Sequence, residues 1–170
     1  MMWLKLRINA FIFYQFFMKY IQAIKELWKD FDPFLHLEKE EIVDETEKFF
    51  VIPARAPYVE NHLLIIPKRK VYVLRELSVD EKEEMYDLID KWSKKLHTIH
   101  NWVNLLLRDW LVWDDLDTEI QKSINHLHFH LIPDCPIWAD TMSDLDRKYY
   151  DDDEYFDLAK NIRIKFLWMK

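Results

Sequence analysis

The most regular hydrophobic pattern in the chain predicts a long helix after Ser78. Ser78 is followed three residues later by Glu81, the spacing of a capping box at a helix start. Beyond it, apolar residues recur at spacings of three and four: Met85, Leu88, Ile89, Trp92, Leu96 and Ile99. This period places them on one face of a helix, so we expect the helix to cover one face of a sheet.

Four short apolar stretches predict the strands of that sheet, at 49–52, 62–66, 103–108 and 124–132. The first two are rich in β-branched residues and bounded by prolines, and the segment 56–61 between them is expected to form a hairpin-like loop. The acidic stretch 37–48 predicts a solvated connection or a short helix. Strands from distant segments with one long helix indicate an α+β fold with a mostly antiparallel sheet.

The two ends of the chain predict helical appendages to one domain. We expect an N-terminal helical extension at 1–30, the domain itself at 31–140, and an acidic helical tail at 141–170 that ends near Phe166. The apolar run 8–17 is about half a membrane span and contains Asn9 and Gln15. We therefore interpret it as an amphipathic helix, or as sequence before a true initiator at Met18, and expect no membrane association.

Charge and cysteine content narrow the function classes. The formal net charge is −7 and the sequence pI about 5.5, which argues against binding a nucleic-acid polymer. An anionic substrate would need a local basic pocket. Cys135 is the only cysteine, so the chain has no internal disulfide, and we expect a cytoplasmic location.

The chain has no glycine and eight tryptophans, whereas average usage predicts about 12 glycines in this length. Trp102, Trp110, Trp113 and Trp138 lie beside Asn, Asp or Pro near strand ends, where turns favour residues that tolerate positive φ. One hypothesis is that UGA encodes glycine in this gene and was translated as tryptophan. The alternatives are a genuinely tryptophan-rich surface and a glycine-free design. Asn61 also occupies a glycine-like position, and UGA cannot explain it.

Three histidines at every second position are the main candidate for chemistry. His126, His128 and His130 would share one face of a strand at 124–132. Three imidazoles on a core strand are costly to bury unless each has a hydrogen-bond partner. Two functional interpretations remain open on spacing alone: a three-histidine zinc site, or a neutral imidazole that acts as a nucleophile beside two assisting histidines.

The segment HLHFHLI at 126–132 fits the His-φ-His-φ-His-φ-φ pattern (φ apolar) of the histidine-triad (HIT) superfamily at every position. HLLIIPKRK at 62–70 is similar to a strand of that family, with Asn61 where glycine is usual and Lys70 where histidine is common. WVNLLLRDW at 102–110 resembles a third family segment, with tryptophan at both glycine positions. Together the similarities cover roughly residues 48–138.

The resemblance implies a role for each histidine and for several polar residues. His128 would attack the α-phosphorus of a nucleotide, His126 would orient it, and His130 would lie near the phosphate oxygens or the leaving group. The nucleotide and phosphate would be bound by four further residues: Ser123, Asn104, Arg108 and Lys122. The last two replace an asparagine and a glutamine of the family pattern. The basic run 68–70 is more simply explained as a solvated strand end.

We therefore expect a HIT-like nucleotide hydrolase or nucleotidyl transferase that acts on a dinucleoside polyphosphate, a nucleoside phosphoramidate or a related substrate. The family resemblance implies a homodimer. We expect no tightly bound cofactor or metal, and Mg²⁺ would enter with the substrate. Two alternatives are kept: a nucleotide-binding regulatory module with little turnover, and a zinc enzyme that uses all three histidines.

Overall fold

The computed structural model describes residues 31–109, 124–136, 147–167 and 169, and its architecture is α+β. Its antiparallel sheet has the strand order β1-β2-β3-β5-β4. The strands are β1 Asp44–Glu45, β2 Phe49–Pro53, β3 Leu63–Pro67, β4 Val103–Leu107 and β5 Phe129–Pro133. The helices are α3 Val79–His97 and α4 Asp152–Phe166, with short 3-10 turns η1 Pro33–Leu35, η2 Lys39–Glu41 and η3 Leu74–Glu76. The predicted fold class is confirmed.

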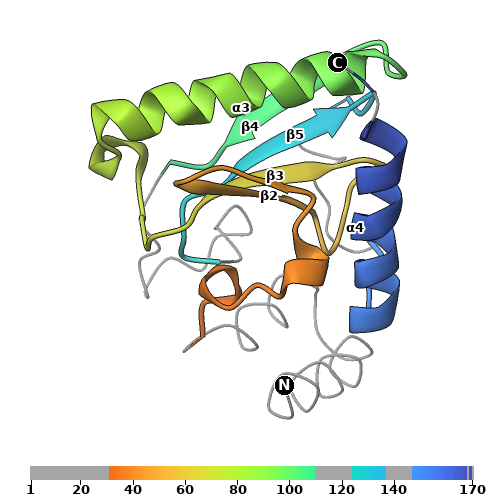
Figure 1. Cartoon of the computed structure of the whole chain (residues 1–170), viewed down its shortest axis with the longest axis horizontal. Helices are drawn as coiled ribbons and strands as arrows, with labels where there is room; N and C mark the ends of the chain where they lie inside the picture. Colours follow the sequence, from red (N-terminus) through yellow and green to blue (C-terminus); the bar gives the residue numbers. More distant parts are fainter. Residues whose placement is uncertain (1–30, 110–123, 137–146, 168, 170) are drawn as a thin grey trace.

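The central strand β3 is buried on both faces, and its alternating side chains divide the core in two. Leu63 and Ile65 belong to the main cluster beneath α3. Leu64 and Ile66 point to the opposite face, where they join a smaller cluster with Phe34. Figure 1 shows α3 along one face of the sheet and the orange η1–η2 segment along the other. The functional residues described below lie on the η1–η2 face.

Helix α3 begins as the sequence predicts. The Ser78 hydroxyl accepts from the Glu81 N–H at 3.2 Å, and the Glu81 carboxylate accepts from the Ser78 N–H at 2.7 Å. Arg69 donates two further hydrogen bonds to Glu81, at 2.6 and 2.8 Å, and this contact lowers the pKa of Glu81 to about 2. The predicted apolar face is buried at Met85, Leu88, Trp92 and Leu96, while Ile99 lies beyond the helix and is exposed.

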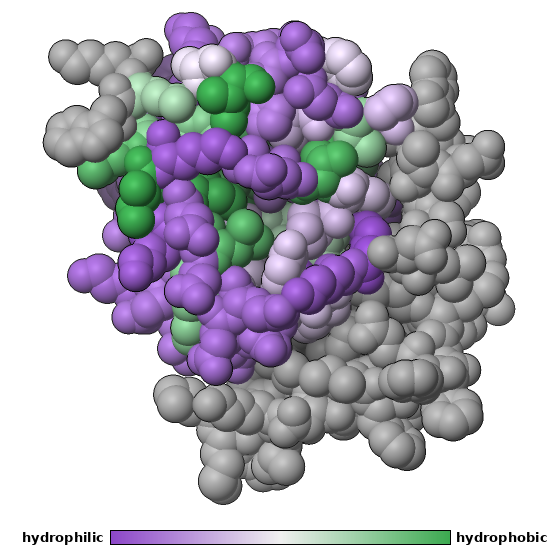
Figure 2. Space-filling model, turned by 90° about the vertical axis from the view of Figure 1, so that its right-hand side faces the viewer, coloured by the Kyte–Doolittle hydropathy of each residue, from purple (hydrophilic) through white to green (hydrophobic). Residues whose placement is uncertain are grey.

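Helix α4 begins at the acidic run, where the Asp151 carboxylate accepts from the Glu154 N–H at 2.9 Å. Its inner face packs into the core and is buried at Tyr155, Ala159, Ile162 and Phe166. The described residues on this side form a mostly hydrophilic surface with small apolar patches (Figure 2); Ile164 on the helix and Leu167 just after it are exposed. No helix in the described part of the chain is both long and apolar enough to span a membrane.

Two parts of the strand prediction are wrong. The strand that carries the histidines begins at Phe129 rather than at 124, because a tight turn precedes it: the His126 N–H bonds to the Ile124 carbonyl at 2.9 Å, and Leu127 then bonds to Val71. The acidic stretch 37–48, predicted as a solvated connection or a short helix, forms the short 3-10 turn η2 and also the strand β1, which was not predicted. The N-terminal helical extension predicted at 1–30 lies outside the described residues.

Left-handed backbone occurs at Asn61 and Asp134 among the described residues, with φ of 61° and 47°. Trp102 is not one of them, so the expectation of positive φ at that tryptophan is wrong; Trp110, Trp113 and Trp138 lie outside the described residues. His100 joins the two left-handed residues: its ring contacts the Asp134 carboxylate at 2.9 Å and the Asn61 amide at 3.0 Å. These contacts hold the start of β3 against the end of β5.

The conformation of Asn61 predicts an unusual order of stability for two variants. Asn61→Gly and Asn61→Ala both lose the contact with His100, but only the alanine variant must hold a Cβ at φ 61°. We expect the glycine variant to have the higher free energy of unfolding, by about 1 kcal/mol. Urea unfolding of the two variants measures this difference, and equal stability of the two would contradict the assigned backbone.

Candidate functional site

The middle histidine is held by a backbone hydrogen bond. The His128 Nδ1 lies 2.7 Å from the carbonyl oxygen of His126. A carbonyl oxygen only accepts, so Nδ1 carries the proton, and in the neutral ring the lone pair is on Nε2. The ring is 7% exposed and packs beside His130, with 4.8 Å between the ring centroids. A neutral imidazole in this tautomer is chemically able to act as a nucleophile through Nε2.

A second chain of hydrogen bonds fixes His130 through His62. The Tyr58 N–H donates to the His62 Nδ1 at 3.3 Å, so the proton of a neutral His62 is on Nε2. That nitrogen lies 3.0 Å from the His130 Nδ1, which must then accept. The His130 proton is therefore on its Nε2. His128 and His130 thus present complementary nitrogens, one with a lone pair and the other with an N–H.

Burial keeps the rings of His62 and His130 neutral. Burial lowers the pKa of His62 to about 3, with smaller contributions from the charges of Arg147 and His128. Burial also holds the pKa of His130 well below its ordinary value, and the nearby charges of His128, His62, Arg108 and Arg147 act in the same direction. In the neutral pair, the proton in the His62–His130 contact is the one on His62 Nε2, as the assigned tautomers require.

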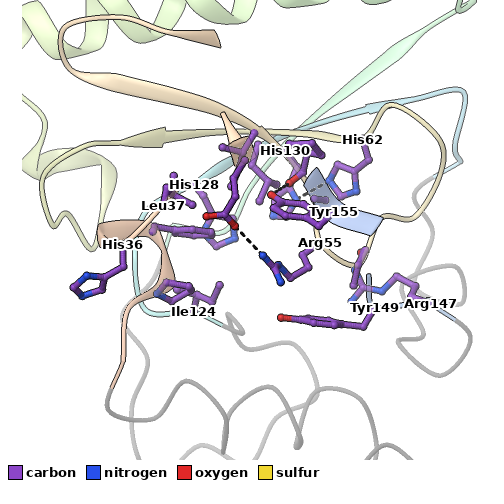
Figure 3. A pocket seen from close by; sticks show the side chains of 18 of the residues that line it. His36, Leu37, Arg55, His62, Ile124, His128, His130, Arg147, Tyr149 and Tyr155 are labelled. Atoms are coloured by element: carbon purple, nitrogen blue, oxygen red, sulfur yellow. Dashed lines mark hydrogen bonds and ion pairs between the residues drawn. The ribbon is translucent and has the colours of Figure 1, made fainter. Parts of the chain in front are cut away.

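The rings of His62, His128 and His130 line a cavity with a volume of about 860 Å³, including its open mouth. One part of its wall is apolar and includes Phe34, Leu37, Ile52 and Ile124. The other part is polar, and Figure 3 shows Arg55 and Tyr149 there, below the histidines. Arg55 forms ion pairs with Glu41 at 2.8 Å and with Asp152 at 2.7 Å. Together these parts match a ligand with an apolar group and polar substituents.

His126 does not line this cavity. Its ring is fully buried, with Nδ1 2.8 Å from the Asp32 carboxylate and Nε2 3.1 Å from the Pro67 carbonyl. Both nitrogens are thus engaged by oxygens away from His128 and His130. The donor set does not fit a zinc ion shared by the three histidines, and no cluster of three or more His, Cys, Asp or Glu in the described ranges could hold a metal.

The predicted phosphate-binding residues are only partly described. Ser123 and Lys122 lie outside the described residues. Asn104 is on β4, where its amide donates to the Cys135 carbonyl at 2.7 Å, and it is not among the cavity-lining residues. Arg108 follows β4 and is close enough for its charge to act on His130. The roles of all four residues therefore remain predictions.

The basic run 68–70 is engaged in ion pairs, in keeping with a structural role. Lys68 pairs with Glu45 at 2.7 Å, Arg69 pairs with Glu81, and Lys70 contacts Asp32.

Sequence reasoning missed several residues of the site. His62 stands at the start of the segment 62–70 that carries the family resemblance, so its position could have been a signal. Arg55, Arg147, Tyr149 and Tyr155 belong to no motif and reach the cavity only through the fold.

The HIT domain model matches residues 37–136 of the 170. The chain belongs to the HIT family. The matched range includes the three histidines, His62 and the whole sheet, and it ends before α4. No curated protein matches this HIT chain.

Solved structures of HIT proteins share the fold. A diadenosine triphosphate hydrolase from Plasmodium falciparum, solved with cyclomarin A, has a TM-score of 0.57 and 15% identity over 75% of this chain and 77% of that chain. A hypothetical histidine triad nucleotide-binding protein from Sulfolobus tokodaii has a TM-score of 0.54 and 25% identity over 79% and 91%. A zinc-bound histidine triad family protein from Mycobacterium smegmatis has a TM-score of 0.51 and 17% identity over 74% and 83%.

The lowered pKa of His62 predicts a pH dependence of stability. Between about pH 6.5 and 3 the unfolded chain protonates this histidine and the folded chain does not. The free energy of unfolding therefore falls as the pH falls, by about 1.4 kcal/mol per pH unit for this one group. We expect His62→Gln to reduce the slope between pH 6 and 5 by about that amount in urea unfolding. The exposed His97→Gln serves as control, and an unchanged slope in His62→Gln would contradict the assignment.

Proposed function

We propose that this protein is a HIT-type nucleotide hydrolase or nucleotidyl transferase that reacts through a covalent bond between the α-phosphorus and Nε2 of His128. The observation that supports it best is the hydrogen bond from His128 Nδ1 to the His126 carbonyl, which places the lone pair on Nε2. Relatives in the same fold include a diadenosine triphosphate hydrolase and a nucleotide-binding protein, which supports a nucleotide as ligand.

The neighbouring His130 supports a balanced reaction. His128 Nε2 attacks the α-phosphorus, the bond from phosphorus to the leaving group breaks, and the Nε2–H of His130 protonates that group. Water, or an acceptor in a transferase, then attacks the phosphorus and returns its proton to His130. The P–N bond breaks and His128 is restored. His62 keeps the His130 proton on the side that faces the reaction, because its own Nε2–H occupies Nδ1.

The two parts of the cavity suggest how the substrate binds. The apolar wall with Phe34, 5.4 Å from the His128 ring centroid, suits a nucleobase. Arg147 lines the cavity near His62 and His130, and its charge, with that of Arg108, favours anionic phosphates there. Magnesium would arrive with a polyphosphate substrate.

Covalent catalysis predicts a mass change that depends on one residue. We expect intact-protein mass spectrometry to show an added nucleotidyl group after brief incubation with ATP, diadenosine polyphosphate or adenosine phosphoramidate. His128→Ala should show no adduct and lose turnover by about a thousandfold or more, since it lacks the nucleophile. His97→Ala on the exposed side of α3 should keep both.

Other outcomes of this experiment would point to the alternatives. Nucleotide binding by wild type and His128→Asn without adduct or turnover would favour the regulatory module. Turnover that requires stoichiometric zinc in the purified protein, without an adduct, would favour the zinc enzyme.

A homodimer is the second part of the proposal, and the edge strand β4 supports it. β4 pairs only with β5 in the described sheet, so its other edge has no described strand neighbour. Leu105 on this strand is 53% exposed and Trp102 just before it is 46% exposed. An apolar open edge suits pairing with the same edge of a second copy.

Charge at this edge should therefore prevent dimer formation. We expect light scattering after gel filtration to give a dimer for wild type and a monomer for Leu105→Glu, because the variant buries a carboxylate in the interface. Ile164→Glu, at an equally exposed apolar position on α4, should stay dimeric. A monomeric wild type would contradict this part of the proposal.

A further inference from the structure

Asp32 joins the N-terminal part of the described chain to the histidines. It is the N-cap of η1, where its Oδ1 accepts from the Phe34 N–H at 3.1 Å. Its Oδ2 accepts from His126 Nδ1 at 2.8 Å and also contacts the Lys70 ammonium. Although burial opposes ionisation, hydrogen bonds from His126 and Lys70 hold the pKa of Asp32 below its ordinary value. The carboxylate is therefore ionised at neutral pH and accepts from every one of these partners.

These contacts immobilise His126 from two sides. The Asp32 carboxylate lies 2.8 Å from Nδ1, and the Pro67 carbonyl lies 3.1 Å from Nε2. The ring is fully buried, so these two oxygens fix its orientation.

The position of His126 in turn determines the tautomer of His128. The carbonyl that accepts from His128 Nδ1 is the one that His126 itself carries, so a fixed His126 residue also fixes this acceptor. Phe34 packs edge-on against both rings, at 5.6 Å from His126 and 5.4 Å from His128. The same carboxylate that holds His126 also caps the turn that presents Phe34 to the cavity.

We propose that Asp32 is a positioning residue for His128: it anchors His126, whose carbonyl keeps the His128 proton on Nδ1, and it fixes the turn that carries Phe34. Asp32 lies outside residues 37–136 that match the HIT domain, so the family comparison assigns it no role. The inference rests on the proposed nucleophilic function of His128, but its structural part is tested without any substrate.

Matched variants separate the contact of Asp32 with His126 from its contacts with Phe34 and Lys70. Asp32→Ser keeps a side-chain oxygen that can cap Phe34 but removes the carboxylate from His126. Asp32→Asn keeps the shape of the side chain and removes its charge. Lys70→Met removes the ammonium that contacts Asp32 and leaves the Asp32–His126 contact in place, so it serves as the control.

Nitrogen-15 NMR of histidine-labelled protein reports the tautomer directly. In wild type and Lys70→Met we expect the His128 signals, assigned by their loss in His128→Gln, to show a protonated Nδ1 and an unprotonated Nε2. In Asp32→Ser and Asp32→Asn we expect a mixture of both tautomers. Wild-type signals in both Asp32 variants would overturn the proposal, whether or not a substrate is known. If one variant does not fold, the other gives the same comparison.

Kinetics then show whether positioning matters for turnover. With a substrate identified, kcat should fall about ten- to a hundredfold in both Asp32 variants, because the nucleophile is misoriented. KM should stay within about twofold in Asp32→Ser, which retains the Phe34 cap. A lost tautomer preference with unchanged kcat would contradict the link to His128, whereas absence of turnover in wild type would count against the proposed function and leave the NMR result standing.

Discussion

The geometry of the candidate site depends on one hydrogen bond, from Nδ1 of His128 to the carbonyl of His126. It decides which nitrogen of His128 carries the lone pair. The neighbouring contacts either fix the His126 carbonyl that accepts this hydrogen bond or determine the tautomer of His130. His126 is fixed by Asp32 and Pro67, and His130 receives its tautomer from His62 and the Tyr58 backbone. The two chains of hydrogen bonds therefore end at adjacent rings: His128 has a lone pair on Nε2, and His130 has an N–H at Nε2.

The fold supplies this arrangement by placing a turn where a regular strand would continue. If the segment from 124 were a strand, all three histidines would share one face. The turn from Ile124 to His126 instead directs the first ring into the protein interior, and only His128 and His130 line the cavity. The three histidines of the repeat therefore have different environments: the His126 ring is buried away from the cavity, and the His128 and His130 rings line it.

Much of the fold follows from local sequence rules. The capping box at Ser78, the period of the α3 face, the proline-bounded strands and the end of α4 near Phe166 are all set by nearby residues and are confirmed. The short strand β1 was missed because its two acidic residues carry no apolar alternation. The start of β5 was wrong because the turn before it depends on Val71, which is distant in sequence.

The candidate site was predictable only where chemistry and motif coincide. The three histidines stand out by spacing, but the partners that give them tautomers do not: Asp32, His62 and Arg55 acquire their contacts through long-range packing. Arg147, Tyr149 and Tyr155 reach the cavity with the C-terminal segment, beyond the matched HIT domain. No local pattern indicates which surface a terminal helix will cover.

The most direct test of the central claim is to locate the nucleotidyl group on the ring of His128. After rapid quenching of the wild-type protein with a substrate that turns over, peptide mapping by tandem mass spectrometry should find the group on His128, and phosphorus-31 NMR should assign the P–N bond to Nε2. A group attached to another residue, to Nδ1 of His128, or steady turnover with no attached group would contradict the account.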